Sequence, residues 1–276
     1  MHLIYKVLAE ASNELKEISG SNSIREARIL LEFVLKNQEK FLNTNHNISN
    51  NDFIIFQRLI KKRLKFQPIS QIIGERYFWK NKFFINSDVL DPRPDTETLI
   101  EHTLSFGSFF NILDLGTGSG CIILSLLDEY NAAMGIGVDK SKKALNVAQK
   151  NAELLNLNDR VKFQLGNWCD GLDNKFDLIV SNPPYISEKE ILGLSNDVIN
   201  WEPRIALTPE GDGLGAYKNI INGVKNILIP NGRIIFEIGH AQGNEVSNLL
   251  KSNNFKEINI VKDINNKDRV ISALWR

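Results

Sequence analysis

The sequence predicts an α/β protein in which a small helical domain precedes a mostly parallel, doubly wound sheet. From about residue 92 onward, short apolar runs alternate with helical patterns, as such a sheet requires. Before about residue 70, apolar residues instead recur at helical spacing. Two distinctive segments, a Gly-rich turn and an Asn-Pro-Pro-Tyr motif, directly follow apolar runs. Open α/β sheets bind ligands at the carboxyl ends of their strands, so both segments are candidate binding sites.

Three helices are expected in the N-terminal region, within residues 4–18, 27–35 and 53–64. Ser23 and Glu26 have the spacing of a capping box for the second helix. The third helix carries a run of positive charges, Arg58, Lys61, Lys62, Arg63 and Lys65. This run is either a solvated helix face or a docking face for an acidic or RNA-bound partner.

Residues 76–90 predict a two-stranded hairpin that turns at residues 80–82 and joins the two domains. The expected organisation is a helical, substrate-docking domain at 1–72, a β-hairpin linker at 73–91 and an α/β domain at 92–276. Seven strands are expected in the last of these, at 111–115, 134–138, 161–164, 176–180, 233–238, 257–261 and 268–275.

Composition excludes several classes of protein. The 276 residues include 33 basic and 33 acidic side chains, and this zero net charge argues against stable binding of duplex nucleic acid. Two unpaired cysteines, Cys121 and Cys169, and four scattered histidines indicate neither a disulfide framework nor a metal site. No stretch approaches the ~18 apolar residues of a membrane span. We expect a soluble, cytoplasmic monomer.

The Gly-rich turn lies in Asn111–Gly120, where a strand runs into Gly116, Gly118 and Gly120. The glycine spacing is not that of a dinucleotide site, and Asp114 would repel a pyrophosphate but attract an ammonium. S-adenosylmethionine, with an ammonium, a sulfonium and no phosphate, fits such a turn. We assign to this cofactor Asp114, Gly116, Thr117, Gly118 and Gly120, together with Asp139, an acid at the tip of the second strand placed to bind ribose hydroxyls.

Asn167 and Trp168 follow the third predicted strand. Trp168 is either a core residue or an aromatic face for the adenine, and Asn167 would accept a hydrogen bond from the adenine amine. We predict that both residues contact the cofactor.

Asn182-Pro183-Pro184-Tyr185 follows the apolar run 176–181. The Asn182 side-chain oxygen and the Pro183 carbonyl can together accept both hydrogens of a planar NH2 group, and Tyr185 offers a face for stacking. The alternative is that two prolines merely end a strand. We predict Asn182, Pro183 and Tyr185 as catalytic, Asn182 as also touching the cofactor, and Pro184 as part of the substrate site. Arg93 either contacts the substrate or pairs with an acid.

Along nearly its whole length the chain resembles the HemK/PrmC family. The resemblance rests on Pro68–Arg76, Pro92-Arg93-Pro94-Asp95-Thr96-Glu97, Asp114–Gly120, Val180–Ile186 and Glu202-Pro203. It implies a Rossmann-like methyltransferase that transfers a methyl group from S-adenosylmethionine to the glutamine of a Gly-Gly-Gln loop in peptide chain release factors. Two positions depart from the family pattern: Asp91, where an aliphatic residue is usual, and Asn167, where an aspartate is common.

Three other functions compete with this one. A nucleic-acid methyltransferase could hold a flipped base amine with the same clamp, although no base-reading domain is evident. A cofactor-binding module without activity would not need Asp114, Asp139 and Asn182 together. The helical N-terminus could also be a protein-interaction domain in its own right.

Overall fold

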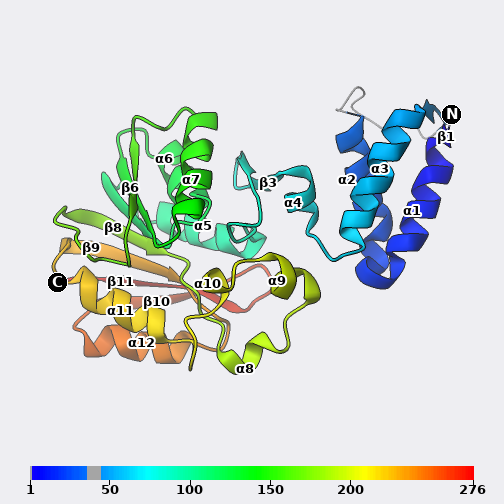
Figure 1. Ribbon diagram of the computed structural model, residues 1–276. Coiled ribbons are helices and arrows are strands. Elements are labelled where there is room, and N and C mark those ends of the chain that lie inside the picture. The colour runs from blue at the N-terminus through cyan, green and yellow to red at the C-terminus, as the bar shows by residue number, and fades with distance from the viewer. Residues whose placement is uncertain (1, 36–44) are drawn as a thin grey trace. The chain divides into compact units, whose positions relative to one another are not determined.

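The computed structural model describes residues 2–35 and 45–276. These residues form two compact units, shown in Figure 1. Unit 1 comprises Met1–Gly74 and Ser195–Trp201, and unit 2 comprises Glu75–Leu194 and Glu202–Arg276. The predicted domain boundaries at residues 72 and 91 stay predictions. No helix in the described ranges is both long and apolar enough to cross a bilayer.

Unit 1 is a helical bundle built on three amphipathic helices. Their apolar faces meet in one core, in which Leu15, Leu30, Leu31 and Phe56 are fully buried. The three predicted helices are therefore present, each slightly longer than expected. The elements of this unit are β1 (His2–Leu3), α1 (Ile4–Ser19), η1 (Gly20–Asn22), α2 (Ser23–Val34), β2 (Asn47–Ile48), α3 (Asn50–Arg63), α4 (Ile69–Ile73) and α9 (Asn196–Trp201).

The predicted capping box at the start of α2 is wrong. Asn22 is the N-cap and its side chain makes no capping hydrogen bond. The Glu26 carboxylate instead accepts hydrogen bonds from the Ser19 hydroxyl and from Arg63, whose Nε lies 2.8 Å from Oε2. A charge-assisted bond to a buried guanidinium outweighs a bond to a backbone N–H, so tertiary structure overrides the local signal.

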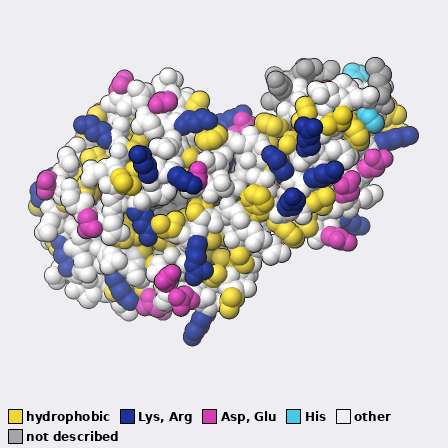
Figure 2. Space-filling model, in the orientation of Figure 1, with side chains coloured by type: hydrophobic (Ala, Val, Ile, Leu, Met, Phe, Trp, Pro, Cys, Tyr) yellow, Lys and Arg dark blue, Asp and Glu magenta, His cyan; other side chains and the backbone are white. Residues whose placement is uncertain are grey.

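The same contact changes the interpretation of the basic run. Arg63 is 6% exposed and belongs to the interior of unit 1, not to a solvated or docking face. The other four basic residues of the run are exposed, and Figure 2 shows Lys and Arg side chains gathered over α3.

Helix α9 belongs to unit 1 although it begins 123 residues after the end of α4 and its neighbours in sequence belong to unit 2. The Gln71 side-chain amide donates a hydrogen bond to the Trp201 carbonyl at 2.9 Å. The Trp201 indole N–H donates to the Lys65 carbonyl at 2.9 Å. These two bonds attach the last residue of the segment through its backbone and through its side chain.

Unit 2 contains a seven-stranded sheet of order β10-β11-β9-β8-β5-β6-β7. The strands from β9 to β7 run parallel, while β11 pairs antiparallel with β9 and with β10. All seven predicted strands are present. Their bounds are β5 (Asn111–Leu115), β6 (Met134–Asp139), β7 (Val161–Leu165), β8 (Phe176–Ser181), β9 (Leu228–Glu237), β10 (Lys256–Lys262) and β11 (Asp268–Leu274).

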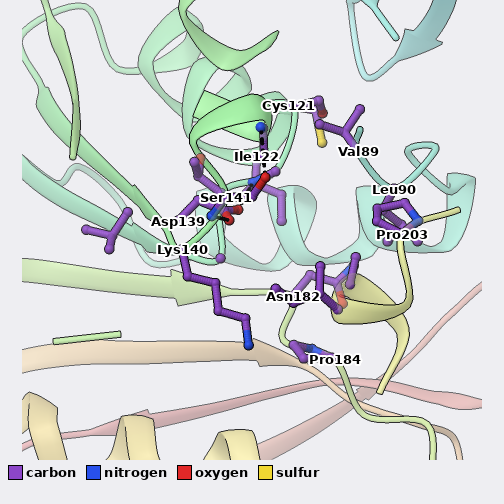
Figure 3. Close-up of a pocket in the computed structure, with 18 of the residues that line it drawn as sticks. Val89, Leu90, Cys121, Ile122, Asp139, Lys140, Ser141, Asn182, Pro184 and Pro203 are labelled. Atoms are coloured by element: carbon purple, nitrogen blue, oxygen red, sulfur yellow. Dashed lines mark hydrogen bonds between the residues drawn. The ribbon is translucent and has the colours of Figure 1, made fainter. Parts of the chain in front are cut away.

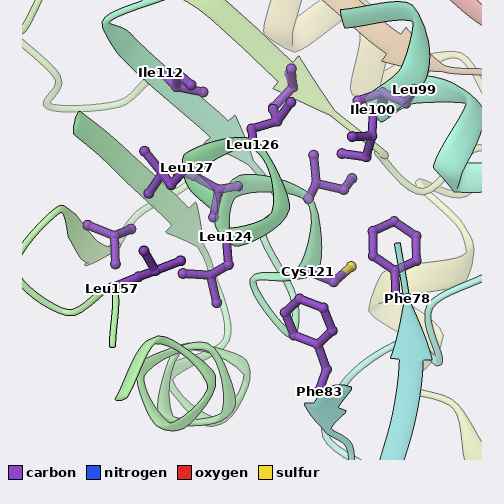
Figure 4. Packing of buried hydrophobic residues seen from close by; sticks show 14 of the residues in the cluster. Phe78, Phe83, Leu99, Ile100, Ile112, Cys121, Leu124, Leu126, Leu127 and Leu157 are labelled. Carbon is purple, nitrogen blue, oxygen red and sulfur yellow. The ribbon is translucent and has the colours of Figure 1, made fainter. Parts of the chain in front are cut away.

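Helices cover both faces of this sheet, because its central strands are apolar on both sides. One face packs against α5, α6 and α7, and the other against α11 and α12. Figure 4 shows Leu124, Leu126 and Leu127 of α6 at the centre of the first cluster. The remaining elements are η2 (Pro94–Thr96), α5 (Glu97–Leu104), α6 (Cys121–Glu129), α7 (Lys142–Leu154), α8 (Glu188–Ile191), α10 (Arg204–Leu207), α11 (Gly215–Val224) and α12 (Gly243–Ser252).

The predicted hairpin exists but is shorter than expected. Strands β3 (Glu75–Phe78) and β4 (Asn81–Phe84) pair with Phe78 opposite Asn81, so the turn is at Trp79 and Lys80 and not at residues 80–82. Trp79 occupies the left-handed region at φ 54°. Phe78 and Phe83 are buried against the α6 cluster (Figure 4), which places the hairpin within unit 2.

Candidate functional site

A pocket opens at the carboxyl ends of β5, β6 and β8 (Figure 3). Strand β5 has β6 on one side and β8 on the other, and the chain passes from β5 to β6 in one direction and later returns to β8 in the other. The loops after β5 and β8 therefore diverge and leave a crevice. Nine of the predicted site residues line it: Arg93, Gly116, Thr117, Gly118, Asp139, Asn167, Trp168, Asn182 and Pro184.

The Gly-rich turn follows β5 with all three glycines in the left-handed region, at φ 73°, 56° and 78°. The Gly116 and Thr117 N–H groups donate to the Val138 carbonyl at 2.8 and 3.0 Å, which fixes the turn to β6. Gly120 does not line the pocket. A Cβ on it would lie 3.1 Å from Leu124 and 3.2 Å from Ala148, so this glycine permits close packing of the helices behind the turn.

Asp139 lies at the end of β6, half-buried in the pocket wall. Its Oδ2 accepts a hydrogen bond from the Gly118 N–H at 2.9 Å, and its Oδ1 accepts one from the Ser141 N–H at 2.8 Å. Each oxygen keeps a second lone pair, so the fixed carboxylate can still accept two hydroxyl groups.

Asp114 is fully buried and does not line the pocket. Its Oδ2 accepts from the Thr117 hydroxyl at 2.7 Å, and its Oδ1 has no hydrogen-bond partner. Burial raises the pKa of this carboxyl group to about 7, with Thr117 opposing the shift and the nearby Asp139 adding to it. An unpartnered buried carboxylate oxygen is the atom of this turn that a ligand cation would stabilise most.

Trp168 and Asn167 come from the loop after β7 and both line the pocket. A Cβ on Gly116 would lie 3.5 Å from the Trp168 ring, so the ring lies directly against the Gly-rich turn. Trp168 also packs against the apolar cluster between the sheet and helices α11 and α12, so it is partly a core residue, and its contact with an adenine stays a prediction. The Asn167 side chain is exposed and donates to Asp170 at 3.3 Å.

Asn182 and Pro184 enter the pocket from the end of β8 (Figure 3). Pro183 and Tyr185 do not line it. Pro183 is buried. Tyr185 packs against the apolar cluster between the sheet and helices α11 and α12, and its hydroxyl donates a hydrogen bond to Glu237 at 3.2 Å. Arg93 lines the pocket and pairs with the buried Glu202, Nη2 to Oε1, at 2.5 Å. The alternative in which Arg93 pairs with an acid is thus present in the structure.

Several pocket residues were not predicted. Val89, Leu90, Ile122 and Ile205 supply apolar walls, and Thr96 lies next to Asn182. Glu237, behind Thr96, is a carboxylate at the end of a buried apolar strand, and that position in the sequence is a signal that could have identified it.

Asp91, noted as a departure from the family pattern, is 5% exposed and lies 3.7 Å from the Arg76 Nε. Arg76 also donates to the Pro92 carbonyl at 3.1 Å. The pair holds the end of the hairpin to the segment that enters the pocket.

The pocket fits S-adenosylmethionine. A glycine turn without side chains admits the close approach of a ligand, a fixed carboxylate suits ribose hydroxyls, and the Trp168 ring with apolar walls suits an adenine. The unpartnered Asp114 oxygen behind the turn supplies the negative charge that an ammonium or sulfonium favours.

Comparison with known proteins gives two family matches. The family described as "Methyltransferase domain" matches residues 108–271, and the "PrmC N-terminal domain" matches residues 6–74. Among solved structures, the hMettl16 catalytic domain superposes with a TM-score of 0.59 at 16% identity, covering 91% of this chain and 90% of that one. This likeness supports the fold alone.

Curated relatives are closer in sequence. The chain is 44% identical over 79% of its length to a release factor glutamine methyltransferase of Cereibacter sphaeroides, 78% of which is covered. It is 36% identical over 97% of its length to a release factor glutamine methyltransferase of Caulobacter vibrioides, 95% of which is covered. A bifunctional methyltransferase of Rickettsia felis is 37% identical, and the chain spans 57% of its length.

Proposed function

The chain belongs to the family of release factor glutamine methyltransferases, and we propose that it methylates the side-chain amide nitrogen of the glutamine in the Gly-Gly-Gln loop of a peptide chain release factor. S-adenosylmethionine supplies the methyl group as an electrophile on a sulfonium. The observation that carries the proposal is the position of Asn182, which shares one pocket with Asp139 and the Gly-rich turn.

A glutamine amide nitrogen is a poor nucleophile because its lone pair is delocalised into the carbonyl. We propose that the Asn182 oxygen in the pocket and, next to it, the backbone carbonyl of the otherwise buried Pro183 accept hydrogen bonds from its two N–H groups and so direct the lone pair at the methyl carbon. Positive charge develops on the nitrogen during transfer, so both hydrogen bonds strengthen in the transition state. The remaining acceleration comes from holding the two reactants in line.

The other predicted roles follow from the same placement. Asp139 binds the ribose hydroxyls, Trp168 and Asn167 bind the adenine, and Asp114 supplies negative charge behind the amino-acid end of the cofactor. Pro203, Ile205 and Ala206 also line the pocket, and we place the acceptor loop on their side. A docking role for residues 1–72 and a monomeric enzyme stay predictions.

The test is transfer of labelled methyl from S-adenosylmethionine to a purified release factor, followed by mass spectrometry of the Gly-Gly-Gln peptide. Asn182→Ala should abolish transfer while leaving cofactor affinity, measured by calorimetry, within about twofold, because Asp139 and the Gly-rich turn supply most of the predicted cofactor contacts and Asn182 adds only one. The matched control is Asn158→Ala, an exposed asparagine outside the pocket, which should leave transfer unchanged.

A second arm tests the acceptor. Replacing the loop glutamine by asparagine withdraws the amide by one methylene, and a misplacement of ~1 Å lowers the rate on the order of 100-fold. Methylation of adenine in DNA with none of the release factor would refute the proposal and favour the nucleic-acid alternative.

A further inference from the structure

A buried carboxylate behind the pocket has no role in the function proposed above. Glu237, at the end of β9, is 2% exposed. The Thr96 hydroxyl donates to its Oε2 at 2.5 Å, and the Tyr185 hydroxyl donates to its Oε1 at 3.2 Å. Burial raises the pKa of this carboxyl group, whereas the Thr96 bond and the charge of Arg269 oppose the rise. A buried acid held by two hydroxyl groups imposes a direction on both of them.

The orientation that Glu237 imposes on the Thr96 hydroxyl affects Asn182. A hydroxyl has a single hydrogen, and Thr96 uses its own on Glu237, so toward any other neighbour Thr96 can only accept. That neighbour is the Asn182 amide nitrogen, 3.5 Å from Thr96 Oγ1. The contact is at the outer limit of a hydrogen bond, as is common for catalytic groups before substrate binds. It turns the NH2 of Asn182 toward Thr96 and leaves its oxygen for the pocket.

The orientation of the Tyr185 hydroxyl is also fixed by Arg269, because a guanidinium group can only donate hydrogen bonds. Its Nη1 lies 3.4 Å from the Tyr185 hydroxyl oxygen. Its Nε lies 3.1 Å from Asp263 and its Nη2 3.4 Å from Asp95. Tyr185 therefore accepts from Arg269 and donates to Glu237. Both series of hydrogen bonds end on the Glu237 carboxylate.

The oxygen and the NH2 of an asparagine are nearly the same size, so packing alone does not choose between them. We infer that Glu237 is a positioning residue that, through the Thr96 hydroxyl, holds the Asn182 oxygen toward the acceptor amide. The inference rests on the proposed function, because the Asn182 oxygen is needed in the pocket only if the group that receives the methyl offers N–H groups. The reverse orientation would oppose N–H to N–H and could not hold the substrate.

Two variants test the inference. Glu237→Gln keeps the shape of the side chain but presents an NH2 that can donate to Thr96, which frees the Thr96 hydrogen for the Asn182 oxygen. Thr96→Val keeps the shape but removes the hydroxyl. Each should lower kcat by about 10- to 100-fold, as for a misoriented reacting group. The affinity for S-adenosylhomocysteine should stay within about twofold, because neither change alters Asp139 or the Gly-rich turn.

The matched control is Thr103→Val, which removes an equally buried hydroxyl bonded to the Leu99 carbonyl at 2.7 Å. It should lower the melting temperature about as much as Thr96→Val but leave kcat unchanged. Thr96→Ser, which restores the hydroxyl, should recover at least tenfold of the loss in kcat. An equal loss for serine and valine would overturn the inference.

The double variant Thr96→Val/Glu237→Gln separates positioning from independent effects. Residues that act in series give losses that do not multiply, so the double variant should be no slower than the slower single variant. Multiplied losses, or wild-type kcat in either single variant, would overturn the inference. If Glu237→Gln fails to fold, the valine and serine variants of Thr96 still decide the outcome. An inactive wild-type enzyme would instead refute the proposed function.

Discussion

Removal of the Asp139 carboxylate should weaken S-adenosylmethionine and S-adenosylhomocysteine equally. The carboxylate is fixed by the Gly118 and Ser141 N–H groups at 2.9 and 2.8 Å, so it is oriented before the ligand arrives. A hydrogen bond to a charged group contributes about 1.5–3 kcal/mol. Asp139→Ala should therefore raise both dissociation constants by roughly 10- to 150-fold. Calorimetric titration of each ligand measures this.

Asp139→Asn provides a stricter test. An asparagine here would direct its NH2 at one of the two backbone N–H groups, so it should not restore affinity although it retains one acceptor. An exposed aspartate outside the pocket, Asp159, is the matched control, and Asp159→Ala should bind both ligands normally. Unchanged affinity of Asp139→Ala for both ligands would show that the ribose is bound elsewhere. Weaker binding of the sulfonium ligand alone would show that Asp139 acts through its charge.

Three further outcomes are expected. Burial raises the pKa of Asp114 from 3.8 to about 7, so between these pH values the folded chain holds a proton that the unfolded chain has lost. The free energy of unfolding of the wild type should therefore fall as pH rises from about 4 to about 7, by up to about 4 kcal/mol in all, and level off above pH 7. The melting temperature of Asp114→Asn minus that of the wild type should accordingly be larger at pH 8 than at pH 5, and a constant difference would contradict this. Arg63→Met should lower the free energy of unfolding, measured by chemical denaturation, by about 2–4 kcal/mol, because it leaves the Glu26 carboxylate without its cation. The double variant Arg63→Met/Glu26→Leu should regain most of this loss. Gly213→Ala should lower kcat, because its Cβ would overlap the Tyr185 carbonyl oxygen and so displace the segment that carries Asn182. Gly211→Ala, also at positive φ but with no atom within 4 Å of its Cβ, should affect only stability. Equal kcat values for the two variants would show that Tyr185 tolerates displacement.

The sequence predicted those features that depend on local pattern. The central strands of the large sheet are apolar runs, the edge strands β7 and β10 mix apolar with polar residues, and both ligand-binding segments are short motifs at strand ends. The hairpin turn was misplaced because Trp79 occupies a left-handed conformation that glycine or asparagine usually marks. The capping box failed because Glu26 is bonded to a residue 37 positions away.

The parts of the site that escaped prediction depend on contacts between distant segments. Thr96 and Glu237 are 141 residues apart, and although Thr96 lies in the Pro92–Glu97 motif and Glu237 ends an apolar strand, neither signal shows that the two side chains meet. Only folding places a hydroxyl from the segment before α5 against a carboxylate from β9. Tyr185 was expected to face the substrate. The segment after Ser181 is neither helix nor strand, so its sequence spacing from Asn182 did not determine on which side the Tyr185 ring would lie.

The place of α9 has a consequence for synthesis of the chain. Domains commonly fold as units from the N-terminus while the ribosome is still translating. Unit 1 follows that order only in part: its apolar core contains no residue of α9, but the Gln71 amide and the Lys65 carbonyl find their partners on Trp201. By the time Trp201 has emerged, β5, β6, β7 and β8 have also been translated. Completion of the N-terminal bundle is therefore delayed until more than half of the sheet strands are available, and a fragment ending at Gly74 would emerge with these two polar groups unmatched.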